Sequence, residues 1–141
     1  MLTLALKANS KIILPKAPNM SDFQLNKMRA KIAVIGLGYV GLPLALAFGE
    51  KFKTIAFDIS KSRIKELKSG IDKTGETTTE NLLNVKNCQF TNDVNSLEEC
   101  NTYVITVPTP IDRNKRPDLS FLISASELVA KFLSLGDVVI F

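Results

Sequence analysis

Short apolar runs alternate with amphipathic segments along most of the chain. The runs are too brief for helices and are rich in the residues that suit a pleated strand. They lie at Lys31–Ile35, Thr54–Phe57, Cys88–Phe90, Thr102–Val107 and Val138–Phe141. Because continuously apolar strands are typical of sheets covered on both faces, these runs predict a buried parallel sheet.

The segments between the runs carry helical spacing. Helices are predicted at Tyr39–Phe48, Lys61–Ser69 and Glu80–Val85, with one further turn through Leu97 and a long helix over 118–133. Short polar residues are expected to cap the amino ends, and glycines to end the helices. The candidate caps are Ser60, Asn92 or Asp93, and Asp118, and the candidate ending residues are Gly70 and Gly136.

Strands that alternate with helices indicate an α/β fold with helices on both faces of the sheet. Right-handed crossovers favour a Rossmann doubly wound parallel sheet with strand order 3-2-1-4-5, truncated in the fifth strand. In this order the chain reverses direction between the first and fourth strands, and ligands bind at the carboxyl ends. Residues 36–41 and 107–110 are therefore predicted to face each other.

Length and apolar content fit one domain, because 45% of the 141 residues are hydrophobic. We expect residues 30–141 to form it, and residues 1–29 to be an N-terminal extension that is partly disordered or irregular. The formal net charge of +4 comes entirely from residues 1–30. The folded part is thus neutral overall, which disfavours nucleic acid as a partner.

Membrane and metal functions are also disfavoured. No run reaches the roughly 18 apolar residues that span a bilayer, and the apolar opening precedes its lysines, the reverse of a signal peptide. Cys88 and Cys100 lack metal-ligand spacing, and the chain has no histidine. We interpret both cysteines as packing residues of a cytoplasmic protein.

The candidate chemistry begins with the glycine motif over residues 36–41, between the first strand and the first helix. Gly36 permits a tight turn, Gly38 lets the backbone approach a pyrophosphate, and Gly41 allows close packing of the helix on the sheet. The helix amino terminus offers N–H groups and a positive dipole end to the phosphates. A glycine turn used only for packing is the alternative.

Three further features point to a dinucleotide. Asp58 follows Gly36 by 22 residues, where a carboxylate accepts hydrogen bonds from ribose hydroxyls and repels a 2′-phosphate, so NAD is preferred. Arg63 could lie against the adenine or ribose, although a solvated arginine is equally consistent. The Val107–Pro110 turn could meet the cofactor through Thr109, or could simply end a strand. The predicted cofactor-binding residues are Gly36, Leu37, Gly38, Tyr39, Val40, Gly41, Asp58, Arg63, Val107, Pro108, Thr109 and Pro110, and no catalytic or metal-binding residue is assigned.

Together these motifs resemble the UDP-glucose/GDP-mannose dehydrogenase family, over about residues 31–141. Within it they are most similar to the UDP-N-acetylglucosamine 6-dehydrogenase branch of the Vi-polysaccharide type, a similarity that rests on residues 70–76. Glucosamine and galactosamine substrates are not distinguished. The resemblance is carried by 31–44, Phe57-Asp58-Ile59, Arg63-Ile64, Gly75-Glu76, Phe90-Thr91, 107–110, Pro117-Asp118-Leu119 and 136–139.

The resemblance implies a role for each part of the site. Tyr39 and Val40 would present backbone to the pyrophosphate, Asp58 and Arg63 would hold the adenosine, and residues 107–110 would line the nicotinamide side. The family oxidises the C6 alcohol of a nucleotide sugar to a carboxylate with two NAD, through a cysteine of a later domain, and the parent enzyme would act in surface polysaccharide synthesis. The chain would then be an N-terminal domain, inactive alone, of an enzyme that dimerises through a helix absent here.

Two other functions compete with this interpretation. One is a stand-alone, non-catalytic module that binds NAD or NADH for regulation. It is less consistent with the sequence, since Pro117-Asp118-Leu119 and the Val107–Pro110 turn have no evident role in such a sensor. The other is an S-adenosylmethionine methyltransferase, whose glycine loop usually lacks the third glycine at this spacing.

Overall fold

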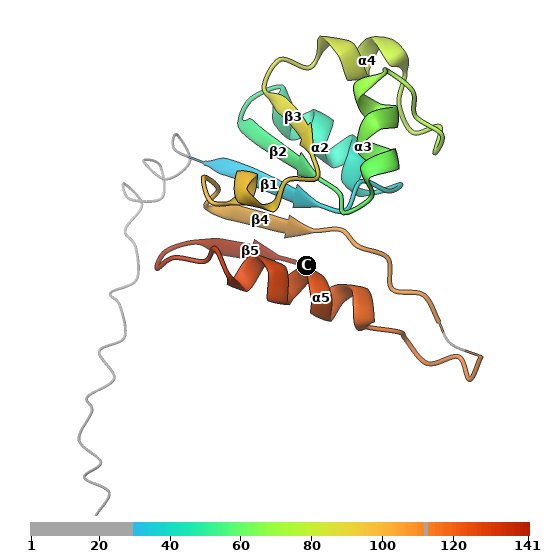
Figure 1. The fold of residues 1–141 in the computed structure, drawn as a ribbon, viewed down its shortest axis with the longest axis vertical. Coiled ribbons are helices and arrows are strands. Elements are labelled where there is room, and N and C mark those ends of the chain that lie inside the picture. The colour runs from blue at the N-terminus through green and yellow to red at the C-terminus, as the bar shows by residue number, and fades with distance from the viewer. Residues whose placement is uncertain (1–29, 112) are drawn as a thin grey trace, which may run out of the picture.

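The computed structural model, which describes residues 30–111 and 113–141, confirms the predicted fold class (Figure 1). Five parallel strands form one sheet in the order β3-β2-β1-β4-β5. The predicted extension over residues 1–29 lies outside the described residues. The strands are β1 (Lys31–Ile35), β2 (Lys53–Phe57), β3 (Cys88–Thr91), β4 (Thr102–Ile105) and β5 (Val138–Ile140), and the helices are α2 (Gly41–Gly49), α3 (Lys61–Lys68), α4 (Thr79–Asn84), the 3-10 helix η1 (Val94–Leu97) and α5 (Ser120–Ala130).

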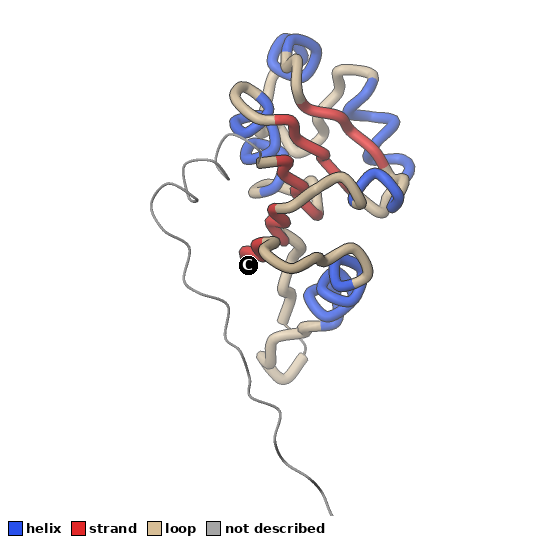
Figure 2. Tube along the Cα trace, turned by 90° about the vertical axis from the view of Figure 1, so that its left-hand side faces the viewer, coloured by secondary structure: helices blue, strands red, loops and turns tan. Residues whose placement is uncertain are grey.

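Alternate residues of β1 face the two sides of the sheet. Ile32 and Val34 belong to one apolar cluster together with residues of α2, α3 and α4. Ala33 and Ile35 belong to a second cluster with residues of η1 and α5. The sheet therefore has helices on both of its faces, as Figure 2 shows, and the period of two expected for a strand decides which cluster each residue joins.

The carboxyl ends of the three central strands lie side by side, at the same end of the sheet. The register pairs Ile35 of β1 with Phe57 of β2 and with Ile105 of β4. The connection from β4 to α5 runs outward beyond this end (Figure 1). None of the helices within residues 30–111 and 113–141 is long and apolar enough to cross a membrane.

The fourth strand is shorter than the sequence predicts, ending at Ile105 instead of Val107. Thr106 still bonds to β1, because its N–H donates to the Ile35 carbonyl over 2.9 Å. Pro108 then has no N–H to continue the ladder, and the chain leaves the sheet.

Helix ends also differ from the prediction. The first helix, α2, begins at Gly41 instead of Tyr39, since the preceding residues form a turn. The last helix, α5, has Leu119 at its N-cap, and the Asp118 carboxylate instead accepts the Ser120 N–H just inside it. This helix ends at Ala130 and does not continue to Leu133. Gly136, at φ +97°, belongs to a separate turn before β5.

Other local predictions are confirmed. The Ser60 hydroxyl accepts the Arg63 N–H at the start of α3, and the Asp93 carboxylate accepts the Asn95 N–H at the start of η1. Gly70 follows α3 with φ +74°, a conformation that glycine adopts without strain. These caps satisfy backbone groups that a helix cannot satisfy internally.

The two cysteines lie at the opposite end of the sheet, near the amino ends of their strands. Cys88 begins β3 and is half-buried, whereas Cys100 precedes β4 and is buried. Burial raises the pKa of Cys88 to about 12 and the pKa of Cys100 to about 11. Both thiols therefore stay protonated near neutral pH, as expected for packing residues that do not act as nucleophiles.

Tyr103 links β4 to the connection before it, and its loss should weaken the fold. Its buried hydroxyl donates to the carbonyls of Leu97 and Cys100 at 3.1 and 2.9 Å. Tyr103→Phe removes this donor from both carbonyls, although Leu97 still accepts the Cys100 N–H, so we expect a loss of about 1–2 kcal/mol in the free energy of unfolding by urea. Tyr39→Phe is the matched control, because Tyr39 is 69% exposed and should be neutral. Equal stability of the two variants would contradict this role.

Candidate functional site

The predicted glycine turn lies at the carboxyl end of β1. Gly36 has φ +95°, in the region where glycine is favoured, and its N–H donates to the Phe57 carbonyl over 2.9 Å. A side chain at Gly36 would lie 3.2 Å from the Thr106 carbonyl and from the Val107 side chain. The structure thus places the glycine turn against the end of β4.

Gly41 packs directly against the backbone of the glycine turn and against Thr106, so that no side chain fits at this position. A Cβ atom at this position would lie 1.8 Å from the Gly36 carbonyl oxygen and 2.4 Å from Thr106 Oγ1. The Thr106 hydroxyl donates toward the Ile35 and Gly36 carbonyls at 3.0 and 2.8 Å. Thr106 was not predicted from the sequence, where its position just before Val107 is the only local signal for this role.

The middle of the turn is open. The Cβ position of Gly38 has no neighbour within 4 Å, and the side chains of Tyr39 and Val40 are 69% and 65% exposed. Val40 is the N-cap of α2 and has no side-chain oxygen to accept an N–H. The amino end of α2 therefore remains accessible to an anionic ligand, which a helix terminus favours.

Asp58 joins the glycine turn to the start of α3. Its Oδ2 accepts the Leu37 N–H at 2.9 Å, and its Oδ1 accepts the Ser60 N–H at 2.9 Å. The α3 cap is Ser60, so Asp58 is free of that task. Each carboxylate oxygen can accept more than one hydrogen bond, so the same group can also receive ribose hydroxyls.

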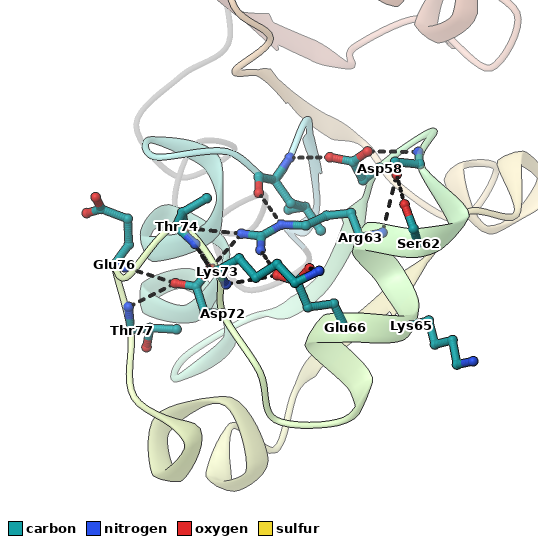
Figure 3. Close-up of polar contacts among 12 residues, drawn as sticks. Asp58, Ser62, Arg63, Lys65, Glu66, Asp72, Lys73, Thr74, Glu76 and Thr77 are labelled. Carbon is teal, nitrogen blue, oxygen red and sulfur yellow. Dashed lines mark hydrogen bonds and ion pairs between the residues drawn. The ribbon is translucent and has the colours of Figure 1, made fainter.

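Arg63 is not a solvated arginine, because its side chain is only 12% exposed. Its Nε donates to the Leu37 carbonyl at 3.0 Å, and its Nη1 donates to Glu66 Oε1 at 2.6 Å. Its Nη2 donates to Asp72 Oδ1 at 2.8 Å and to Thr74 Oγ1 at 3.2 Å. Figure 3 shows this guanidinium between the glycine turn and the loop after α3.

Asp72 organises that loop and was not identified from the sequence as a site residue. Its fully buried carboxylate accepts hydrogen bonds from the N–H groups of Thr74, Glu76 and Thr77, and from the Thr74 hydroxyl. Burial opposes ionisation, but the hydrogen bonds from Thr74 and Arg63 outweigh it and lower the pKa of Asp72 to about 2. Asp72 therefore remains a carboxylate at neutral pH.

Two cavities border the glycine turn, and Gly36, Asp58 and Pro108 line both. One cavity, of about 450 Å³, is lined mainly by polar and charged residues and extends from the turn to the loop after α3; we call it the polar cavity. The apolar cavity, of about 260 Å³, extends toward α5. The polar cavity is also lined by Leu37, Gly38, Ser60, Ser62, Arg63, Glu66, Lys73, Thr74 and Thr106, and the apolar cavity by Ile35, Phe57, Ile59, Val107, Phe121, Ser124, Ala125 and Leu128.

The apolar cavity brings in residues that sequence reasoning had missed. Ile59 and three apolar residues of α5 contribute to it, and the spacing of Phe121, Ala125 and Leu128 along one helix face was the available signal. Thr109 and Pro110 are exposed and line neither of these two cavities. A contact between Thr109 and a cofactor therefore stays a prediction.

Residues 30–141 match the family model described as UDP-glucose/GDP-mannose dehydrogenase family, NAD binding domain. Over 111 residues the chain is 52% identical to UDP-N-acetyl-D-glucosamine 6-dehydrogenase of Salmonella typhi and 50% identical to the protein of the same name from Pseudomonas aeruginosa. Each match covers 79% of this chain and 26% of the relative. The chain thus spans about a quarter of the length of these relatives.

Solved structures agree with the sequence relatives. UDP-D-ManNAc dehydrogenase from Pyrococcus horikoshii matches with a TM-score of 0.67 and 34% identity, over 77% of this chain and 27% of that one. NDP-N-acetyl-D-galactosaminuronic acid dehydrogenase from Methanosarcina mazei matches with a TM-score of 0.70 and 30% identity, over 83% and 28%. With the glycine turn and Asp58 in place, these matches confirm the resemblance found in the sequence. The chain belongs to the UDP-glucose/GDP-mannose dehydrogenase family, and residues 30–141 are its NAD-binding domain.

Proposed function

We propose that this chain holds NAD for a UDP-N-acetylglucosamine 6-dehydrogenase, which oxidises C6 of the sugar to a carboxylate with two NAD. Support for this substrate comes from the names of the two bacterial relatives at 52% and 50% identity. A role in surface polysaccharide synthesis in the cytoplasm, and a homodimeric full-length enzyme, are part of the same proposal.

The observation that carries the cofactor assignment is the position of Asp58. Its carboxylate is fixed at the carboxyl end of β2 by the Leu37 and Ser60 N–H groups and lines both cavities. We place the ribose hydroxyls of the adenosine on this carboxylate. The pyrophosphate then lies over Gly38 and the amino end of α2, where backbone N–H groups and the helix dipole stabilise its charge.

We place the adenine in the apolar cavity. Its walls include Ile59, Val107, Pro108 and Phe121, and a flat aromatic base buries apolar surface between such side chains. This position differs from the nicotinamide side that the family resemblance implies for residues 107–110. The reason is that Val107 and Pro108 line the same cavity as Asp58.

Within the described residues the chain orients NAD but supplies no reactive thiol to the site. Bound NAD would accept a hydride from the sugar carbon. Cys88 and Cys100 lie at the other end of the sheet, and burial raises the pKa of each thiol. We therefore expect this 141-residue chain to bind NAD without turnover, the nucleophile and the sugar-nucleotide site being supplied from outside it.

Calorimetric titration with NAD tests the proposed site. We expect binding that Asp58→Ala weakens about tenfold or more, because the ribose hydroxyls lose a charged acceptor worth about 1.5–3 kcal/mol. Asp93→Ala is the matched control, since Asp93 caps the distant helix η1 and should leave NAD affinity unchanged. No detectable binding at millimolar NAD would contradict the proposal.

A further inference from the structure

The cations that line the polar cavity are Arg63 and Lys73, and one carboxylate engages both of them. Glu66 Oε1 accepts Arg63 Nη1 at 2.6 Å, and Glu66 Oε2 lies 3.3 Å from Lys73 Nζ. The backbone N–H of Lys73 also donates to Glu66 Oε1 at 2.9 Å. Figure 3 shows the three side chains together beside Asp72.

The hydrogen-bonding capacity of Arg63 is largely used within the protein. Its Nε and both Nη nitrogens already donate to Leu37, Glu66, Asp72 and Thr74. A guanidinium has five N–H donors in a fixed fork, so few remain for a ligand. An arginine next to the ribose can bind a 2′-phosphate only if its N–H groups are free to donate to the phosphate oxygens.

Carboxylates outnumber the cations in this region before any ligand binds. Asp58 and Glu66 oppose Arg63 and Lys73 around the cavity, and Asp72 adds a further carboxylate behind it. A backbone hydrogen bond from Lys73 lowers the pKa of Glu66, which keeps that carboxylate ionised at neutral pH. A 2′-phosphate, with a charge of about −1.5 to −2, would meet cations that already pair with Glu66, Arg63 in a buried pair and Lys73 in an exposed one.

We propose that Glu66 is a second specificity-determining residue, which excludes NADP by withholding Arg63 and Lys73 from the ribose 2′-position. The proposal rests on the cofactor site described above, and it adds a second contribution to that of Asp58. Asp58 repels the 2′-phosphate directly, whereas Glu66 removes the cations that could compensate for its charge. Ser60 and Ser62 line the same cavity and add hydroxyl groups that can donate to a phosphate.

The two contributions should not be independent, which gives a sharp test. While Asp58 is charged it repels the phosphate, so releasing the cations at Glu66 has a limited benefit. Once Asp58 is neutral, the Arg63 Nη1 group and Lys73 that Glu66 no longer holds can contact the phosphate, while Leu37 and Asp72 keep Arg63 in place. Both substitutions act on the same bound phosphate, so their effects on its binding are expected to be coupled and not simply additive.

The experiment compares wild type with Asp58→Asn, Glu66→Gln and the double variant, by calorimetric titration of the 141-residue chain with NAD and with NADP. Both substitutions remove a charge and keep the size and an acceptor oxygen. We expect the ratio of Kd for NADP to Kd for NAD to fall in the double variant about tenfold below the value that the two single effects predict together. Glu80→Gln, on the exposed face of α4, is the control for net charge and should leave the ratio unchanged.

The outcomes separate this inference from the proposed site. Normal NAD binding with strictly multiplicative effects on the ratio would overturn the inference and leave the site intact. A wild-type chain that binds neither nucleotide would overturn both. If Asp58→Asn does not fold, Glu66→Gln alone decides: we expect its ratio to fall about threefold, and an unchanged ratio would overturn the role of Glu66.

Discussion

Gly41→Ala should abolish detectable NAD binding and destabilise the fold by about 3 kcal/mol, the upper part of the usual range for overpacking. The added methyl group would overlap the Gly36 carbonyl oxygen at 1.8 Å and Thr106 Oγ1 at 2.4 Å. Backbone atoms cannot rotate away as a side chain can, so the turn and the first residues of α2 must separate. Thermal unfolding of the variant and calorimetric titration with NAD measure the two effects.

Gly38→Ala is the matched control, because it adds the same methyl group to the same turn. Its Cβ position has no neighbour within 4 Å, so stability should be unchanged. NAD affinity should still fall, since the methyl group would occupy space that we assign to the pyrophosphate. If Gly41→Ala were as stable as wild type, or if both variants lost the same stability, the close contact at Gly41 would not be what excludes a side chain there.

Asp72→Ala should lower the free energy of unfolding by about 3–5 kcal/mol, as expected when one partner of a buried ion pair is removed. The variant leaves Arg63 without one of its two carboxylates and removes the acceptor that holds the loop over Thr74–Thr77. Urea unfolding at neutral pH measures the loss. Asp137→Ala, which removes an exposed acceptor of the Ser134 N–H before β5, should cost far less.

The same residue predicts how stability depends on pH. The pKa of Asp72 is about 2 in the folded chain, below its ordinary value of 3.8. A lowered pKa contributes stability that is fully present above about pH 4 and is lost as the pH falls through 2. Unfolding measured between pH 5 and 2 should therefore show a shallower decline in Asp72→Ala than in wild type. Parallel pH profiles would contradict this contribution.

Local patterns were enough to predict most elements of this fold. The apolar runs, the glycine after β1 and the caps at Ser60 and Asp93 are set by interactions between residues close in the chain. The ends of β4 and α5 were predicted too late in the chain. Pro108 has no N–H to continue β4. After α5, the N–H groups of Lys131 and Phe132 bond to carbonyls three residues back, and a separate turn precedes β5.

The environment of Arg63 shows why the site could be predicted only in part. The position of Arg63 one turn into the helix after Asp58 indicated that it lies near the adenine or ribose, but the sequence did not indicate which residues it contacts. Leu37 lies 26 residues before it, and Asp72 and Thr74 lie 9 and 11 residues after it. Such contacts depend on how the chain folds back between α3 and the loop, which no short-range spacing specifies.

By itself the sequence determined the strand order, the glycine turn and a carboxylate at the end of β2. These follow from hydrophobic period, glycine conformation and the handedness of crossovers, which are local or general properties of the chain. Only the tertiary structure decided the apolar cavity beneath α5 and the ion pairs of Arg63 and Lys73. Their energies depend on distance and burial between segments that meet only after folding.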